Sequence, residues 1–171
     1  MQKLALDRYA RLYHEHYGLE TVALRYFNVY GPRQQGGAYS GVISTFLDQV
    51  DAGDSLTIHG DGEQTRDFVH VDDVVQANLL AATSERDGRA YNVGTGRETT
   101  ITALAERIRD LADAEVDIVN EAPRPGDVRH CSADCSRAKR ELRYEPSIEL
   151  ESGLRSLVRA RAAGRVATGS Q

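Results

Sequence analysis

An apolar run from Thr21 to Phe27 constrains the fold more than any other feature of the sequence. It combines β-branched and aromatic residues with little alternation between apolar and polar positions. This pattern is typical of a strand that is buried on both faces of a parallel sheet. Because helices must cover both faces of such a sheet, the run predicts an α/β fold.

The rest of the chain alternates between helices and short strands. Apolar residues at helical spacing predict helices over residues 2–17, 41–52, 72–83, 100–112, 134–142 and 149–163. Short apolar runs predict strands over residues 56–59, 66–71, 89–93 and 116–119. Asp72 and Asp134 are expected to cap the helices that they begin. Residues 28–40 are predicted to be a loop, and residues 164–171 a disordered tail.

Composition and charge exclude several classes of partner. The net charge of −5 argues against nucleic acid, because phosphate binding needs a basic face. No stretch approaches the roughly 18 apolar residues of a membrane span, so no membrane partner is expected. The spacing of Cys131 and Cys135 indicates neither a disulfide framework nor a zinc site, and the histidines are not spaced as metal ligands. A cytoplasmic protein with reduced thiols and no metal is expected.

The first predicted helix begins abruptly. No capping residue, turn or strand precedes residues 2–17, although apolar side chains recur along one side of that helix. A dinucleotide-binding Gly-rich turn of the form G-x-G-x-x-G also does not occur in the sequence. The chain is therefore expected to be a truncated protein that contains only part of a dinucleotide-binding fold.

Four segments carry more specific information. They are LRYFNVYGPRQ (24–34), IHGDGEQTRDFVHVDD (58–73), YNVG (91–94) and RPGD (124–127). In this order and spacing, the chain resembles the extended short-chain dehydrogenase/reductase family. Within that family it looks like the NAD-dependent nucleotide-sugar epimerases and dehydratases, and it resembles their C-terminal part only.

This resemblance implies a domain organisation. The family combines a Rossmann-type NAD-binding domain with a small nucleotide-sugar-binding domain. Residues 1–35 would be a remnant of the NAD-binding domain, comprising one helix and one strand. Residues 36–163 would mostly form the substrate domain, with strands that return to the main sheet, and residues 164–171 would follow as the tail.

The resemblance also assigns catalytic and cofactor-binding residues. The first helix is similar to the family helix that begins at a Tyr-x-x-x-Lys pair, with Lys3 as the lysine and the tyrosine before Met1. In the family, the tyrosine takes a proton from the sugar while hydride passes to NAD, and the lysine cation lowers the pKa of the tyrosine. Lys3 would thus be catalytic and bind NAD, and Phe27, Val29 and Tyr30 would line the nicotinamide side.

Two arginines are the strongest candidates for binding a nucleotide sugar. The resemblance places Arg66 and Arg124 on the diphosphate, whose oxygens match the forked geometry of a guanidinium. Asn28 would donate its amide to the same diphosphate. Asp127 would accept from the ribose hydroxyls.

Three further residues would bind the two ends of the substrate. By resemblance, Val42 begins a helix beside the nucleotide base, and Ile58 belongs to a strand that presents backbone groups to uracil or thymine. Cys131 would lie against the hexose. A small side chain there leaves room for an N-acetyl group at the 2-position, whereas a bulky one excludes it.

The function implied is an NAD-dependent nucleotide-sugar 4-epimerase that acts on UDP-hexoses or UDP-N-acetylhexosamines through a 4-keto intermediate. This chain alone would be inactive, because it lacks the tyrosine. A sugar-nucleotide 4,6-dehydratase and a UDP-glucuronate decarboxylase remain alternatives within the family. A non-catalytic nucleotide-sugar-binding remnant is the alternative outside enzymes. The full-length form is expected to be a homodimer.

Overall fold

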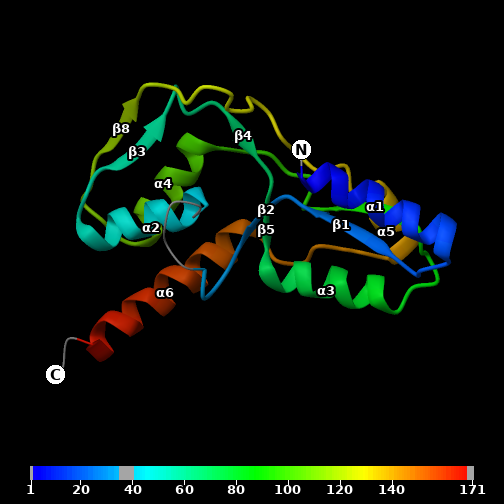
Figure 1. Cartoon of the computed structure of the whole chain (residues 1–171). Coiled ribbons are helices and arrows are strands. Elements are labelled where there is room, and N and C mark those ends of the chain that lie inside the picture. Colours follow the sequence, from blue (N-terminus) through cyan, green and yellow to red (C-terminus); the bar gives the residue numbers. More distant parts are fainter. Residues whose placement is uncertain (1, 35–40, 169–171) are drawn as a thin grey trace.

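A computed structural model describes residues 2–34 and 41–168 of the chain (Figure 1). The helices are α1 (Gln2–Tyr17), α2 (Val42–Ala52), α3 (Val71–Ala82), α4 (Ile101–Leu111), α5 (Ser136–Leu142) and α6 (Leu150–Thr168). The strands are β1 (Val22–Tyr26), β2 (Asn28–Tyr30), β3 (Leu56–His59), β4 (Thr65–Arg66), β5 (Phe68–His70), β6 (Arg89–Val93), β7 (Thr99–Thr100) and β8 (Ile118–Glu121). Among the described residues, no helix is both long enough and apolar enough to cross a bilayer.

One half of the molecule, which we call the N-lobe, is built from α1, β1, α3, β6 and α5 (Figure 1). Strands β1 and β6 pair in parallel, with Val22 opposite Arg89 and Tyr26 opposite Val93. Buried residues of β6, α3 and α5 form the core of this lobe. Helix α1 contributes no buried residue to it.

The other half, the C-lobe, consists of α2, β3, α4, β8 and α6. Strands β3 and β8 are parallel, and the three helices pack against them and against one another. Phe46, Leu56, Ile58, Leu104 and Ile108 are completely buried in its core. The C-lobe therefore encloses a hydrophobic core of its own.

A third parallel pair, β2 with β5, lies between the two lobes (Figure 1). Successive side chains of a strand point to opposite faces. Accordingly, Phe68 belongs to the core of the C-lobe, and the next residue, Val69, belongs to the core of the N-lobe. On β2, Tyr30 joins the C-lobe core and Val29 packs against the N-lobe core. The β2–β5 pair thus ties the two cores together.

The predicted α/β fold with parallel strands is confirmed, and β3 and β6 have the predicted bounds. The predicted loop over residues 28–40 instead begins with strand β2; residues 35–40 lie outside the described part. The predicted tail is wrong over residues 164–168, where α6 continues, and residues 169–171 are not described.

Both predicted helix caps are wrong. His70 caps α3, because its ring accepts a hydrogen bond from the backbone N–H of Asp72 at 3.2 Å. Cys135 occupies the N-cap position of α5. Asp134 lies just before it and accepts from the backbone N–H of Ser136 at 2.9 Å, so its side chain turns the chain into the helix without occupying the cap.

Candidate functional site

A cavity of about 560 Å³ opens in the C-lobe. Helix α2, strands β3 and β4 and the loop after β8 line it. Six residues that the sequence assigns to the substrate share this cavity: Asn28, Val42, Ile58, Arg66, Arg124 and Asp127. They come from five separate segments of the chain, and the fold brings them to one place.

One wall of the cavity is formed by α2 and β3. Val42, at the start of α2, lines this wall with Thr45 of the same helix and Thr57 of β3, and all three are half-buried. Phe46 and Ile58 also border the cavity, but both are 0% exposed and lie in the core beneath it. The wall therefore presents both apolar and polar side chains to a ligand.

Arg66 is held firmly at the opposite, polar side. Its Nη1 donates to the backbone carbonyl oxygens of Thr65 at 2.8 Å and Val128 at 2.5 Å. Its Nη2 forms an ion pair with Asp127. The side chain of Arg66 is only 16% exposed. A guanidinium fixed in this way loses little conformational freedom when an anion binds.

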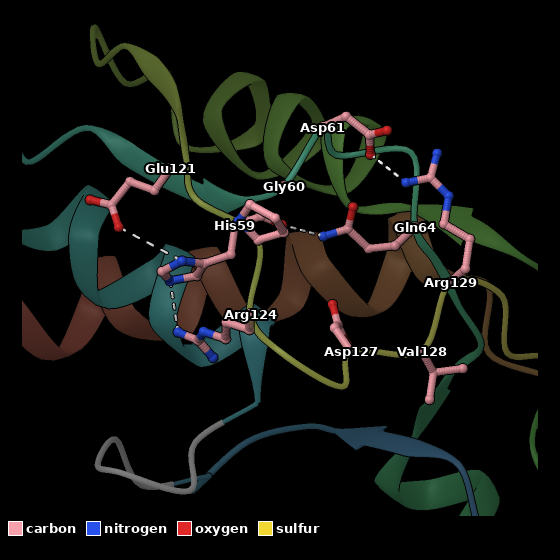
Figure 2. Close-up of a pocket in the computed structure, with 10 residues that line it drawn as sticks. His59, Gly60, Asp61, Gln64, Glu121, Arg124, Asp127, Val128 and Arg129 are labelled. Carbon is pink, nitrogen blue, oxygen red and sulfur yellow. Dashed lines mark hydrogen bonds and ion pairs between the residues drawn. The ribbon is translucent and has the colours of Figure 1, made fainter.

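Arg124 lies on the exposed loop after β8. Its Nη2 is 2.8 Å from Nε2 of His59, and the other ring nitrogen of His59, Nδ1, is 3.7 Å from a carboxylate oxygen of Glu121 (Figure 2). The same loop separates the cavity from a neighbouring hollow, and Arg124 borders both. The two arginines of the cavity are therefore placed by different contacts.

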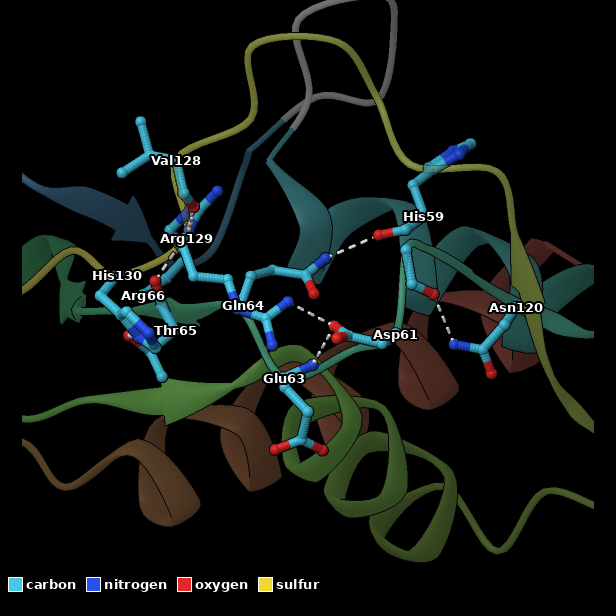
Figure 3. A network of polar contacts seen from close by, with 11 residues as sticks. His59, Asp61, Glu63, Gln64, Thr65, Arg66, Asn120, Val128, Arg129 and His130 are labelled. Atoms are coloured by element: carbon cyan, nitrogen blue, oxygen red, sulfur yellow. Dashed lines mark hydrogen bonds and ion pairs between the residues drawn. The ribbon is translucent and has the colours of Figure 1, made fainter.

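Further contacts hold this loop against β4 (Figure 3). The backbone N–H of Thr65 donates to the carbonyl of Arg129 at 2.8 Å. Arg129 in turn donates to Asp61 at 2.6 Å, and this hydrogen bond holds the pKa of Asp61 below its usual value. The loop that carries Arg124 and Asp127 is thus fixed at its far end.

Asn28 stands at the start of β2, at the carboxyl end of β1. Its side-chain amide donates to the carbonyl of Asp67 at 3.0 Å, and its backbone N–H donates to the same oxygen at 3.0 Å. An amide nitrogen carries two hydrogens. The second hydrogen can be donated to a ligand in the cavity.

The family model described as the NAD dependent epimerase/dehydratase family matches residues 1–94, which is more than half of the chain. The chain belongs to this family.

Named relatives agree with this assignment. A putative UDP-glucose 4-epimerase of Methanocaldococcus jannaschii is 38% identical over 158 residues, covering 92% of this chain and 51% of the relative. A UDP-N-acetyl-alpha-D-glucosaminuronate decarboxylase of Bacillus cytotoxicus is 33% identical over 147 residues, covering 82% of this chain and 46% of the relative.

A solved structure is similar in fold as well. The UDP-glucose 4-epimerase of Thermotoga maritima, crystallised with UDP-glucose, superposes with a TM-score of 0.90 at 39% identity, covering 94% of this chain and 52% of that chain. The predicted fold, the C-terminal part of a Rossmann-type extended short-chain dehydrogenase, is therefore confirmed. The chain spans about half the length of the relatives it matches.

The residues assigned to the family cofactor do not share the cavity. Lys3 is exposed on α1, and Phe27 donates its backbone N–H to Val93 at 3.0 Å. Tyr30 is 2% exposed, burial raises its pKa, and its hydroxyl has no partner among the described residues. Its side chain abuts Gly153 of α6, which leaves only its backbone for a ligand. Without a Gly-rich turn, these residues do not form a complete dinucleotide site, and their roles stay predictions.

Cys131 is half-buried and does not line the cavity. The role of this residue beside a sugar also stays a prediction. Among the described residues, no group of three or more histidine, cysteine or acidic side chains could hold a metal ion.

The sequence analysis assigned no role to two buried carboxylates, Asp67 and Asp73, that each accept several hydrogen bonds. Asp67, fully buried next to Arg66, accepts from the backbone N–H groups of Thr95, Gly96 and Ala133 at 2.8–3.0 Å and from the Thr95 hydroxyl at 2.6 Å. Asp73 accepts similarly from residues 147 and 148. No local pattern marks these residues, because their partners lie 28 to 75 positions away.

Proposed function

We propose that this chain forms the nucleotide-sugar-binding part of an NAD-dependent UDP-sugar 4-epimerase. The observation that carries the proposal is the meeting of Arg66 and Arg124 at one cavity that α2 and β3 also line. A nucleoside diphosphate carries about two negative charges on its diphosphate, and the two guanidinium groups match them.

Each lining residue then has a role in binding. The base lies between Val42 of α2 and the backbone of Ile58, and the two guanidinium groups bind the diphosphate with the free amide hydrogen of Asn28. Asp127 accepts from the ribose hydroxyls. Arg66 pairs with Asp127 in the structure, so a bound ribose and diphosphate would share contacts with a pair that is already in place.

The cofactor of the whole protein is proposed to be NAD. Lys3 and the backbone of Phe27, Val29 and Tyr30 would contribute one side of its site, with residues 1–35 as part of the NAD-binding domain. The whole protein is proposed to be a cytoplasmic homodimer. The free thiols of Cys131 and Cys135 fit a reducing compartment.

The binding proposal is tested by titrating the chain with UDP and UDP-glucose in a calorimeter. Arg66→Ala and Arg124→Ala should each weaken binding by about 1.5–3 kcal/mol, the range for hydrogen bonds to charged groups. Arg155→Ala is the matched control, because Arg155 lies on α6 of the same lobe and pairs with Glu151 away from the cavity. Affinity that is unchanged in both cavity mutants would refute the proposal.

The chain alone is proposed not to epimerise UDP-sugars. The resemblance implies a tyrosine general base in a Tyr-x-x-x-Lys pair, and the 171 residues of this chain contain no such pair. Incubation with UDP-glucose and NAD, followed by separation of UDP-glucose from UDP-galactose, should show no conversion. Clear turnover would contradict the alignment of Lys3.

A UDP-sugar decarboxylase is a second candidate for the whole protein. The similarity to a decarboxylase favours it, because the residues of this cavity would hold the nucleotide and not the reacting sugar carbon. The two reactions are distinguished by incubating the full-length protein with UDP-glucuronate and NAD. Release of carbon dioxide would favour the decarboxylase, whereas interconversion at C4 would favour the epimerase.

A further inference from the structure

His59, the last residue of β3, lies between Glu121, the last residue of β8, and Arg124 of the loop that follows β8 (Figure 2). Its Nε2 is 2.8 Å from Nη2 of Arg124, and its Nδ1 is 3.7 Å from Oε2 of Glu121. The backbone of His59 is fixed, because β3 pairs with β8 and its carbonyl accepts from the side chain of Gln64 at 2.7 Å. The backbone that carries the His59 ring is thus fixed, whereas the neighbouring Arg124 lies on an exposed loop.

The two neighbours select one form of the ring. A guanidinium has only N–H donors, so the Nε2 atom facing Arg124 must be an unprotonated acceptor. The ring proton then lies on Nδ1, where it faces the carboxylate of Glu121. A neutral ring with its proton on Nδ1 accepts from Arg124 and turns its N–H toward the carboxylate of Glu121, which at 3.7 Å is beyond hydrogen-bond distance.

Arg124 depends on this ring far more than Arg66 depends on any one partner. Arg66 has two carbonyl oxygens and a carboxylate around its guanidinium. Within the described part of the chain, Arg124 has no ion pair with a carboxylate, and its hydrogen bond is the one to His59. A free arginine side chain would lose considerable rotamer entropy on binding an anion.

We propose that His59 is a positioning residue that holds Arg124 at the mouth of the cavity, ready for the diphosphate of a nucleotide sugar. This inference rests on the proposed function of the cavity. One of the five N–H donors of Arg124 is used by His59, so the others remain for phosphate oxygens. His59 acts through Arg124 and does not itself need to touch the ligand.

The experiment measures the affinity of the chain for UDP at pH 8.0 in four variants. His59→Phe removes the acceptor and should weaken binding by roughly tenfold, which does not exceed the loss expected for Arg124→Ala. His59→Gln keeps an acceptor oxygen and should bind within about threefold of the wild type.

The double variant His59→Phe/Arg124→Ala tests whether the two side chains act together. If His59 works through Arg124, the double variant binds no more weakly than Arg124→Ala alone. Additive losses or an unchanged His59→Phe variant would each overturn the proposal.

A measurement without ligand separates this proposal from the proposed function. The ¹⁵N shifts of the His59 ring should show the proton on Nδ1 in the wild type and a shift toward the other tautomer in Arg124→Ala. Absence of UDP binding by the wild type would refute the function of the cavity. A ring with its proton on Nε2 would refute the positioning role whether or not UDP binds.

Discussion

The C-lobe and the N-lobe differ in how completely they cover their apolar surface. Of the large hydrophobic residues recorded as exposed among the described residues, only Val119 and Val128 lie outside the first 26 residues and α3. The others are Leu4, Leu6, Tyr9, Leu12, Tyr13, Tyr17, Leu19, Tyr26, Val75 and Leu79. Most of the exposed large apolar side chains of the described residues therefore lie on the N-lobe, whereas the lobe with the candidate binding cavity covers nearly all of its own.

This difference separates binding from chemistry. The cavity needs only the C-lobe, β2, β4 and the loop after β8, all of which pack within this chain. The cofactor residues predicted from the sequence lie on α1, on β2 and at Phe27 between β1 and β2. Strand β1 pairs with β6 alone among the described strands. We therefore expect nucleotide binding without turnover.

The largest difference between the two lobes is expected in how far truncating an apolar side chain lowers the free energy of unfolding. Phe46→Ala in the C-lobe core should lower the free energy of unfolding by about 3–5 kcal/mol, because Phe46 is fully buried. Leu6→Ala on α1 should change it by less than about 0.5 kcal/mol, since Leu6 is 69% exposed. Urea unfolding followed by circular dichroism measures both. Similar losses in the two variants would mean that α1 is covered as well as α2.

Elements with a clear local pattern could be predicted from the sequence, whereas elements that depend on pairing with distant strands could not. Strands β3 and β6 have the predicted bounds because glycines such as Gly60 and Gly94 follow their apolar runs directly. Strands β2 and β7 are too short to show a period of two, and only pairing with distant strands creates them.

The site shows a similar limit. Three of the four motifs contribute residues to the cavity, whereas YNVG contributes none and Val42 lies outside all four. A motif does not show which distant side chain each of its residues contacts. The pairing of Arg66 with Asp127 and of Arg124 with His59 therefore could not be predicted. The burial of Tyr30 was missed for the same reason, because α6 covers it from more than a hundred residues away.

The connection between the lobes should be the next most sensitive feature. Asp67→Asn would replace one carboxylate oxygen by an amide N–H₂, which cannot accept from the backbone N–H groups that now donate to Asp67. The free energy of unfolding should fall by about 2–3 kcal/mol. Asp72→Asn is the control, because Asp72 has a 71% exposed side chain at the start of α3. UDP affinity should also fall in Asp67→Asn, since Arg66 is its neighbour. Equal stabilities of the two variants would show that Asp67 is not a brace.

The exposed face of the N-lobe should affect association more than stability. Val75→Glu on α3 removes an apolar side chain that is 50% exposed, and the free energy of unfolding should change by less than about 0.5 kcal/mol. Concentration-dependent self-association, measured by sedimentation velocity, should decrease, because exposed apolar patches drive contacts. Gln76→Glu adds the same charge at an exposed polar position. If it reduced association equally, charge and not apolar contact would be the cause.

The smallest effect is expected at a polar contact on the surface of the N-lobe. Tyr91 donates its hydroxyl to Glu141 at 2.9 Å, and this hydrogen bond, with nearby Arg89, holds the pKa of Glu141 below its usual value. A carboxyl whose folded pKa is lowered contributes stability above its unfolded pKa and loses it as the pH falls through the folded pKa. Tyr91→Phe should therefore raise the pKa of Glu141 in a ¹³C titration and reduce stability slightly more at pH 7 than at pH 3. Tyr144→Phe removes a hydrogen bond to the carbonyl of Gly94, which does not titrate in this range, so its effect should be the same at both pH values. An equal pH dependence in the two variants would mean that Glu141 does not depend on Tyr91.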